Sequence, residues 1–290
     1  MNSIYLKRFR VKWLNRIVLE LKRQPRVPVD SKTISPNVLS DKPLEEIAVL
    51  EIWEGNRQIG LGELFNIKGD TGGPTSDFHV VVSGDTRKIR CLGYRMSSGL
   101  LKIEGDAGMY VGEEMCGGLI SVDGSAGSWL GSKMRGGSIE VFGDAGDHVG
   151  AAYRGSHEGM TGGQIRIHGD CGSEAGSWMS NGTVRVEGNA GMFPGVHMCG
   201  GIILIDGNCT GRAGAGMTGG MVIIRGRMET ILPSFSIEQI RKRVKVREET
   251  IEGPFYVFRG DVGGARTGRI FVNVATNPQL IWCEKYLEAW

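Results

Sequence analysis

The chain has 290 residues, 40% of them hydrophobic, which is enough for one large domain or two ordinary ones and excludes a disordered chain. Its formal net charge of only +2 does not indicate a nucleic-acid-binding protein, which is usually strongly basic. The six cysteines include no CxxC pair and the five histidines lie far apart, so zinc and iron–sulfur ligand spacings are excluded.

The first residues are rich in positive charge but do not form a long apolar run. Nowhere in the chain do about 18 consecutive apolar residues occur, so we expect no membrane span and a cytoplasmic protein. Two local basic runs are predicted to be solvated faces or partner contacts. They comprise Lys7, Arg8, Arg10, Lys12 and Arg16, and then Arg241, Lys242, Arg243, Lys245 and Arg247.

A glycine-rich repeat dominates the middle of the chain. Its copies begin at Gly99, Gly118, Gly137, Gly163, Gly182, Gly201 and Gly220, a spacing of 19 residues with one step of 26. The first two copies read GLLKIEGDAGMYVGEEMCG and GLISVDGSAGSWLGSKMRG, and 34 of the 47 glycines lie between residues 99 and 226. A phosphate-binding loop is needed only once per site. A glycine-rich loop that recurs at a fixed interval therefore indicates a structural repeat and not a phosphate site.

Each repeat begins with a predicted strand whose third and fifth positions are apolar, as Leu101 and Ile103 are in the first copy. A glycine corner follows, where we expect positive φ or a side-chain-supported turn. A second short strand is expected to bury Val111, Leu130, Val149, Ala175, Pro194 and Ala213, and after it comes a column of Met115, Met134, Met160, Met179, Met198 and Met217.

These features predict an all-β solenoid, a parallel β-helix of 19-residue coils that bury their inner faces only by stacking. We expect an N-terminal cap over residues 1–62, the solenoid over 63–226 and a C-terminal cap over 227–290. FNIKGD at 65–70, VVVSGD at 80–85 and FYVFRGDVGG at 255–264 are interpreted as weaker copies of the repeat. Capping-box spacing of Ser236 and Gln239 predicts a short helix in the C-terminal cap.

No catalytic, cofactor-binding or metal-binding residue is expected in this chain. The methionine column is interpreted as a core stack, because methionine fills irregular gaps. The Asp106, Asp144 and Asp170 series favours corner hydrogen bonding over calcium binding.

Apolar residues at outward positions are predicted to contact another element or chain, and so is the seven-residue insertion near residues 151–157. The predicted partner contacts are Tyr110, Trp129, Phe193, Ile202, Leu204, Met221 and Ile223. On this interpretation Ile203→Asp should unfold the neighbouring coils, whereas Ile223→Asp should weaken assembly and largely spare the fold.

The pattern GGxIxVxGDAGxxVGxxMxGG, together with ISPNVLSDKPLEEIAVLEIWEGNRQIGLGELFNIKGD at 34–70, resembles the C subunit of formylmethanofuran dehydrogenase. The resemblance covers roughly residues 16–270. It implies a right-handed parallel β-helix that serves as a scaffold in a cytoplasmic archaeal complex of methanogenesis, which reduces CO2 and attaches it as formyl to methanofuran. The repeat alone is shared with the C-terminal domain of the glutamate synthase large subunit.

The resemblance implies that the cofactors belong to the partners. These would be a molybdopterin-type redox subunit with tungsten or molybdenum, an amidohydrolase-like subunit with a binuclear metal site, and iron–sulfur subunits. Two alternatives stay open, namely the C subunit of a formyltransferase/hydrolase complex and a glutamate-synthase-type structural domain.

Overall fold

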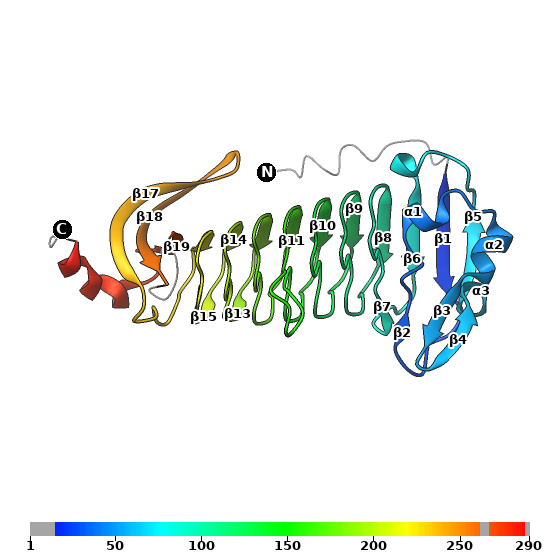
Figure 1. Ribbon diagram of the computed structural model, residues 1–290, viewed down its shortest axis with the longest axis horizontal. Coiled ribbons are helices and arrows are strands. Elements are labelled where there is room, and N and C mark those ends of the chain that lie inside the picture. The colour runs from blue at the N-terminus through cyan, green and yellow to red at the C-terminus, as the bar shows by residue number, and fades with distance from the viewer. Residues whose placement is uncertain (1–14, 262–266, 288–290) are drawn as a thin grey trace.

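The computed structural model describes residues 15–261 and 267–287, which form an elongated molecule with its strands side by side (Figure 1). The strands are β1 (Arg16–Leu21), β2 (Val29–Asp30), β3 (Glu51–Glu54), β4 (Arg57–Gly60), β5 (Phe65–Gly69), β6 (His79–Ser83), β7 (Ile89–Arg90), β8 (Leu100–Glu104), β9 (Leu119–Val122), β10 (Ser138–Val141), β11 (Gln164–Ile167), β12 (Thr183–Val186), β13 (Ala190–Met192), β14 (Ile202–Ile205), β15 (Cys209–Gly211), β16 (Met221–Ile224), β17 (Ser236–Val246), β18 (Glu249–Gly260) and β19 (Gly268–Asn273). The helices are α1 (Pro36–Leu39), α2 (Leu44–Val49), α3 (Leu61–Leu64) and the 3-10 helices η2 (Thr75–Asp77) and η3 (Pro278–Tyr286).

The first strand of every repeat pairs in parallel with the same strand of the next repeat. Leu101 lies opposite Ile120, and Ile120 lies opposite Ile139, so equivalent side chains form one buried file. The step of 26 residues leaves this register intact, because Ile139 lies opposite Ile165. The predicted stacking of the inward strand positions is therefore confirmed.

The predicted fold class, a parallel β-helix with separate caps, is wrong. The main sheet is mixed and has thirteen strands in the order β17-β18-β19-β16-β14-β12-β11-β10-β9-β8-β6-β1-β5. Its central strands are parallel, but β5 joins β1 antiparallel at one end, and β18 joins β19 and β17 antiparallel at the other. The terminal regions thus continue the sheet instead of closing a solenoid. The predicted boundaries at residues 62 and 226 stay a prediction.

The rest of each repeat consists mostly of turns, so the prediction of a second strand in every repeat is also wrong. Beyond the main sheet, the described repeats share a β13–β15 pair and isolated bridges such as Ala107 to Ala126. The reason lies in the backbone, because Tyr110 and Trp129 have φ of 65° and 67°, values that turn the chain out of a strand. The expected burial is confirmed, since Val111, Leu130 and all six column methionines are inaccessible to solvent.

Close packing explains most of the corner glycines, and positive φ explains fewer of them than expected. Gly105 has a φ of 111°, but Gly124 at the same position of the next repeat does not have a positive φ. A Cβ on Gly124 would lie 2.3 Å from Oδ1 of Asp106 and 2.7 Å from the carbonyl carbon of Gly105. Glycine is needed there because neighbouring repeats bring their backbones into contact.

The corner side chains connect successive repeats by hydrogen bonds, as predicted for the aspartate series. The backbone N–H of Ser125 donates to Oδ1 of Asp106 at 2.8 Å, and that of Asp170 donates to Oδ1 of Asp144 at the same distance. The N–H of Asn189 donates to Oδ1 of Asp170 at 2.6 Å. Each aspartate therefore satisfies a donor of the following repeat.

Two of the three weaker copies do not pair as repeats. FNIKGD contains β5, which runs antiparallel to β1. Residues 255–260 of FYVFRGDVGG belong to the antiparallel strand β18, and its residues 262–264 lie outside the described part of the chain. VVVSGD contains β6, which does pair in parallel with both β1 and β8. The parallel strand that follows the break in the repeats is β19, next to β16. Local sequence likeness did not reveal strand direction, because direction depends on the connection.

The predicted helix at Ser236 is wrong, because Ser236–Val246 forms β17, the outer strand of a long hairpin with β18 (Figure 1). Val244 and Val246 alternate with exposed Arg243 and Lys245, which is the period of a strand with one buried face. Pairing with β18 over most of its length outweighs the local capping signal.

This hairpin covers four residues that were predicted to be partner contacts. Leu204 and Ile223 are buried in a second core with Phe255 and Phe271, and Ile202 and Met221 pack against it. The apolar outward face thus does require a cover, as predicted, but the cover belongs to the same chain. Leu204 and Ile223 are thus buried within this chain, whereas Ile202 and Met221 are half-buried, and contact of these side chains with another chain stays a prediction.

Ile203→Asp and Ile223→Asp are therefore both expected to destabilise the fold strongly. Each would place an unpaired carboxylate in a fully buried position, whereas truncating such a side chain to alanine already costs about 2–5 kcal/mol. Urea unfolding measures the loss, and Ser121→Asp, at a half-buried outward position, serves as the control. An Ile223→Asp protein with wild-type stability would contradict the assigned cover.

Candidate interaction surface

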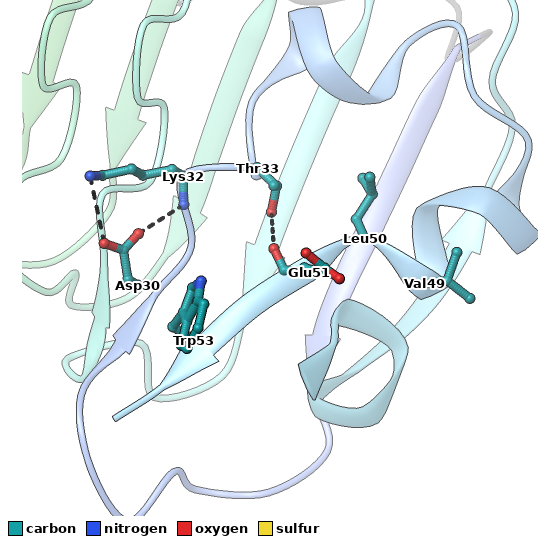
Figure 2. A pocket seen from close by; sticks show the side chains of 7 residues that line it. All are labelled: Asp30, Lys32, Thr33, Val49, Leu50, Glu51 and Trp53. Atoms are coloured by element: carbon teal, nitrogen blue, oxygen red, sulfur yellow. Dashed lines mark hydrogen bonds and ion pairs between the residues drawn. The ribbon is translucent and has the colours of Figure 1, made fainter. Parts of the chain in front are cut away.

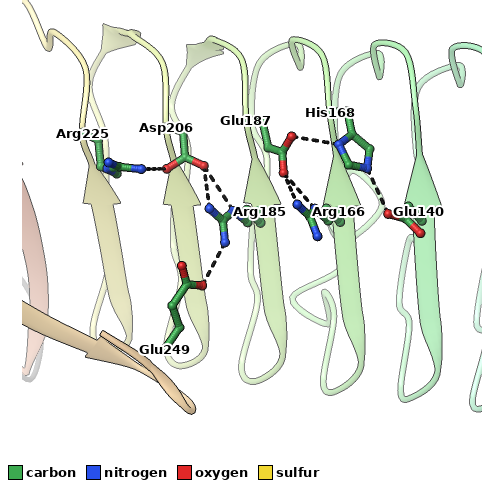
Figure 3. A network of polar contacts seen from close by, with 8 residues as sticks. All are labelled: Glu140, Arg166, His168, Arg185, Glu187, Asp206, Arg225 and Glu249. Carbon is green, nitrogen blue, oxygen red and sulfur yellow. Dashed lines mark hydrogen bonds and ion pairs between the residues drawn. The ribbon is translucent and has the colours of Figure 1, made fainter. Parts of the chain in front are cut away.

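The outward face of the parallel strands carries a chain of alternating charges where the hairpin leaves it open (Figure 3). Consecutive strands place these side chains side by side because their registers coincide, as Arg166 and Arg185 show by lying opposite each other. The members are Glu140, Arg166 and Arg185 from the parallel strands, His168, Glu187, Asp206 and Arg225, each directly after the end of such a strand, and Glu249 from the hairpin.

Glu187 connects the N-terminal half of this charge chain. Its carboxylate accepts from Nε of Arg166 at 2.8 Å and lies 2.8 Å from Nδ1 of His168, whose Nε2 lies 2.9 Å from Glu140. Burial raises the pKa of Glu187, but the hydrogen bonds from Arg166 and His168 outweigh this effect, so its pKa lies below the ordinary 4.5. The ionised carboxylate is therefore part of the folded structure.

The other half of the charge chain fastens the hairpin to the sheet. Arg185 donates to Asp206 at 3.0 Å and to Glu249 at 2.9 Å, and Arg225 donates to the second oxygen of Asp206 at 2.9 Å. Next to the hairpin turn, Arg247 donates to Oγ1 of Thr183 at 2.8 Å. The hairpin is thus held by polar contacts as well as by its apolar underside.

A stack of rings runs along another side of the repeats. Tyr110, Trp129 and His148 occupy equivalent positions, and their ring centroids are 6.1 Å and 4.2 Å apart. All three have positive φ, an unusual conformation for residues other than glycine. Two of the predicted contact residues, Tyr110 and Trp129, therefore lie together, half-buried against their neighbours.

The seven-residue insertion packs onto this stack. Tyr153 lies against both Tyr110 and Trp129, with ring centroids 5.9 Å and 5.3 Å away, and its hydroxyl donates to the carboxylate of Glu113. Glu113 is only 6% exposed, so the Tyr153 hydroxyl is the hydrogen-bond donor to a buried carboxylate. Sequence reasoning missed the Tyr153–Glu113 pair, because the two residues are 40 positions apart and belong to no motif.

Phe193 lies apart from this stack, on a later repeat. The guanidinium of Arg212, at the equivalent position of the next repeat, lies over its ring at 5.4 Å. The structure therefore brings together two of the three aromatic residues predicted to contact a partner. Contact of Tyr110, Trp129 and Phe193 with a partner chain stays a prediction.

An open pocket of about 580 Å³ lies in the N-terminal region, where the residues after β2 diverge from the end of α2 and the start of β3 (Figure 2). Trp53 and the Asp30–Lys32 pair form one side of it, and Val49 lies at the other end. Trp53 and Val49 are exposed. Nothing in the sequence identified this pocket, because β2 and β3 meet only after the chain has passed through α1 and α2.

The cysteines described by the structure are free thiols. Burial raises the pKa of Cys91 and of Cys171 to about 12, and that of Cys209 to about 11, so these thiols stay protonated near neutral pH. Within residues 15–261 and 267–287, no group of three or more His, Cys, Asp or Glu side chains could hold a metal ion. No helix of the described part is long and apolar enough to cross a membrane.

The resemblance to the C subunit of formylmethanofuran dehydrogenase is confirmed by curated relatives. The tungsten-containing C subunit of Methanothermobacter marburgensis is 38% identical over 99 residues, 34% of this chain and 37% of that protein. The molybdenum-containing C subunit of Methanosarcina barkeri is 36% identical over 95 residues, 33% of this chain and 32% of that protein. The chain spans about a third of the length of the relatives it matches. No family model matches the sequence.

A solved structure resembles the chain over most of its length. A chain of the formyltransferase/hydrolase complex from Methylorubrum extorquens, solved with methylofuran, superposes with a TM-score of 0.77 at 28% identity. The superposition covers 88% of this chain and 99% of that chain. The likeness therefore extends beyond the stretch shared with the curated relatives.

Glu187→Gln is expected to destabilise the fold near neutral pH. The stabilisation is present above the ordinary pKa of 4.5 and is lost as pH falls through the lower folded value, because only the ionised carboxylate pairs with Arg166 and His168. The difference in unfolding free energy should be about 1 kcal/mol at pH 7 and shrink in acid. Exposed Glu229→Gln is the control, and a difference independent of pH would contradict the assignment.

Tyr153→Phe is expected to lower the unfolding free energy by about 1–3 kcal/mol, because buried Glu113 would lose its hydroxyl donor. The phenylalanine ring can still pack on Trp129, so the loss reports the hydrogen bond. Urea unfolding measures it, with Tyr286→Phe on the exposed side of η3 as the control. Adding Glu113→Gln should recover part of the loss. Equal stability of Tyr153→Phe and wild type would disprove the pairing.

Proposed function

We propose that this chain is the C subunit of a formylmethanofuran dehydrogenase complex, which reduces CO2 and attaches it as formyl to methanofuran. The observation that carries the proposal is the similarity to the C subunits of both the tungsten and the molybdenum enzymes. Likeness to almost the whole of one chain from a solved formyltransferase/hydrolase complex supports it. The complex is proposed to act in the archaeal cytoplasm.

Within such a complex, the chain acts as a scaffold and the chemistry belongs to other subunits. This role is supported by the polar side chains of the chain, because they make contacts within the fold. The corner aspartates accept backbone hydrogen bonds, the outward charges pair with one another, and the buried thiols stay protonated. The proposed partners are a redox subunit that holds tungsten or molybdenum on a pterin, an amidohydrolase-like subunit with two metals, and iron–sulfur subunits.

A second candidate is the C subunit of a formyltransferase/hydrolase complex. The superposition over 99% of a chain from the Methylorubrum extorquens complex favours it. This alternative differs in chemistry, because a hydrolase complex needs no redox metal. Metal content therefore separates the two candidates.

The test is to purify the affinity-tagged chain from its native host and to analyse the proteins and metals that accompany it. We expect a stable complex that contains tungsten or molybdenum and forms formylmethanofuran. A chain that is purified alone as a monomer would contradict both candidates. A complex that transfers formyl groups but lacks both metals would establish the second candidate.

A further inference from the structure

One edge of the main sheet is long and unpaired. β17 is the last strand in the sheet order, so among the described residues one side pairs with β18 and the other side faces no strand. It has 11 residues, whereas β5 at the opposite end has 5. A strand edge of this kind presents backbone N–H and C=O groups that another strand can complement.

This edge is strongly basic. Arg241, Lys242, Arg243 and Lys245 are all exposed, although the whole chain has a net charge of only +2. Lys242, Arg243 and Lys245 form no ion pair with the residues that the structure describes. Glu249 and Glu252 lie on the inner strand β18 and Glu248 lies in the turn, whereas Glu238, near the start of β17, pairs with Arg269.

The hairpin that carries the basic edge is held against the sheet. The underside of the hairpin packs on Leu204 and Ile223, and Arg185 and Thr183 hold its turn end through Glu249 and Arg247. Because the backbone of the hairpin is already held in place, a partner of opposite charge would not have to order a flexible arm of this chain on binding.

We propose that β17 docks an acidic, extended segment of a neighbouring protein subunit, which adds to the sheet as a further strand. This inference rests on the proposed function, because it names one contact of the scaffold. A polypeptide is the occupant because it can pair with both the N–H and the C=O groups of the edge, whereas a phosphate backbone could use only the donors. Asp or Glu at alternate positions would face Arg241, Arg243 and Lys245, which share one face of the strand.

Charged side chains on an edge strand can also serve only to prevent pairing, and the experiment separates the two roles. The full chain, tagged and expressed in its native host, carries Lys242→Glu, Arg243→Glu and Lys245→Glu. The control reverses three exposed cations elsewhere, namely Arg26, Arg57 and Arg227, of which Arg57 forms a long, exposed ion pair of 4.0 Å with Glu63. Circular dichroism and thermal melting verify that both variants fold. Quantitative mass spectrometry then measures the subunits recovered with each.

We expect the β17 variant to recover about tenfold less of at least one subunit, and the control to recover as much as wild type. A photo-cross-linking amino acid at Ile240, which is 42% exposed, should attach to an acidic segment of that same subunit. The two proposals can fail separately. If the wild-type chain is recovered alone, the proposed function fails and this inference fails with it.

If the wild type recovers its subunits and the β17 variant recovers them equally, only the docking edge is disproved. Self-association of the variant with full recovery of the subunits would show that the cations merely protect the edge. Cross-linking to nucleic acid or to a second copy of the chain would also overturn the proposal.

Discussion

The structure depends on one constraint: the inward side chains of a repeat are buried only by the same positions of its neighbours. Leu101, Ile120 and Ile139 show this, because parallel pairing in register places each directly above the last. The seven inserted residues lie in the turn region of their repeat and leave the strand register unchanged, so Ile139 still pairs with Ile165. A shift by one residue would expose the whole file, since side chains alternate between the two faces of a strand.

Polar groups and backbone packing support the same register. At the corners, the carboxylate of one repeat accepts the backbone N–H of the next, as Asp106 does from Ser125. The absence of a side chain at Gly124 lets the two backbones touch at that point. On the outward face the register also aligns Arg166 and Arg185, and Glu187 and Asp206 offset the repulsion between these like charges. Core, corner and surface therefore all require the same spacing.

The sequence allowed the local parts of this arrangement to be predicted, because the information recurs every 19 residues. Inward positions such as Val184, the methionine column and the corner hydrogen bonds all follow from that period. The ends of the sheet did not, because pairing there depends on single segments that meet only in three dimensions. Ser236 and Gln239 have helical capping spacing, yet β18 makes their segment a strand. Ile223 was recognised as apolar and outward-facing, but its cover is a hairpin of the same chain.

The two ends of the sheet face the same physical problem and solve it differently. A stack of parallel strands has two edges, and each exposes backbone groups that attract further strands. At one end β5 is short and is followed by an irregular segment, which leaves little edge to pair. At the other end β17 is more than twice as long, and folding the hairpin back over Leu204 and Ile223 moves that edge outward, away from the parallel strands. The apolar outward face and the basic edge are therefore linked, because the hairpin that buries the first also presents the second.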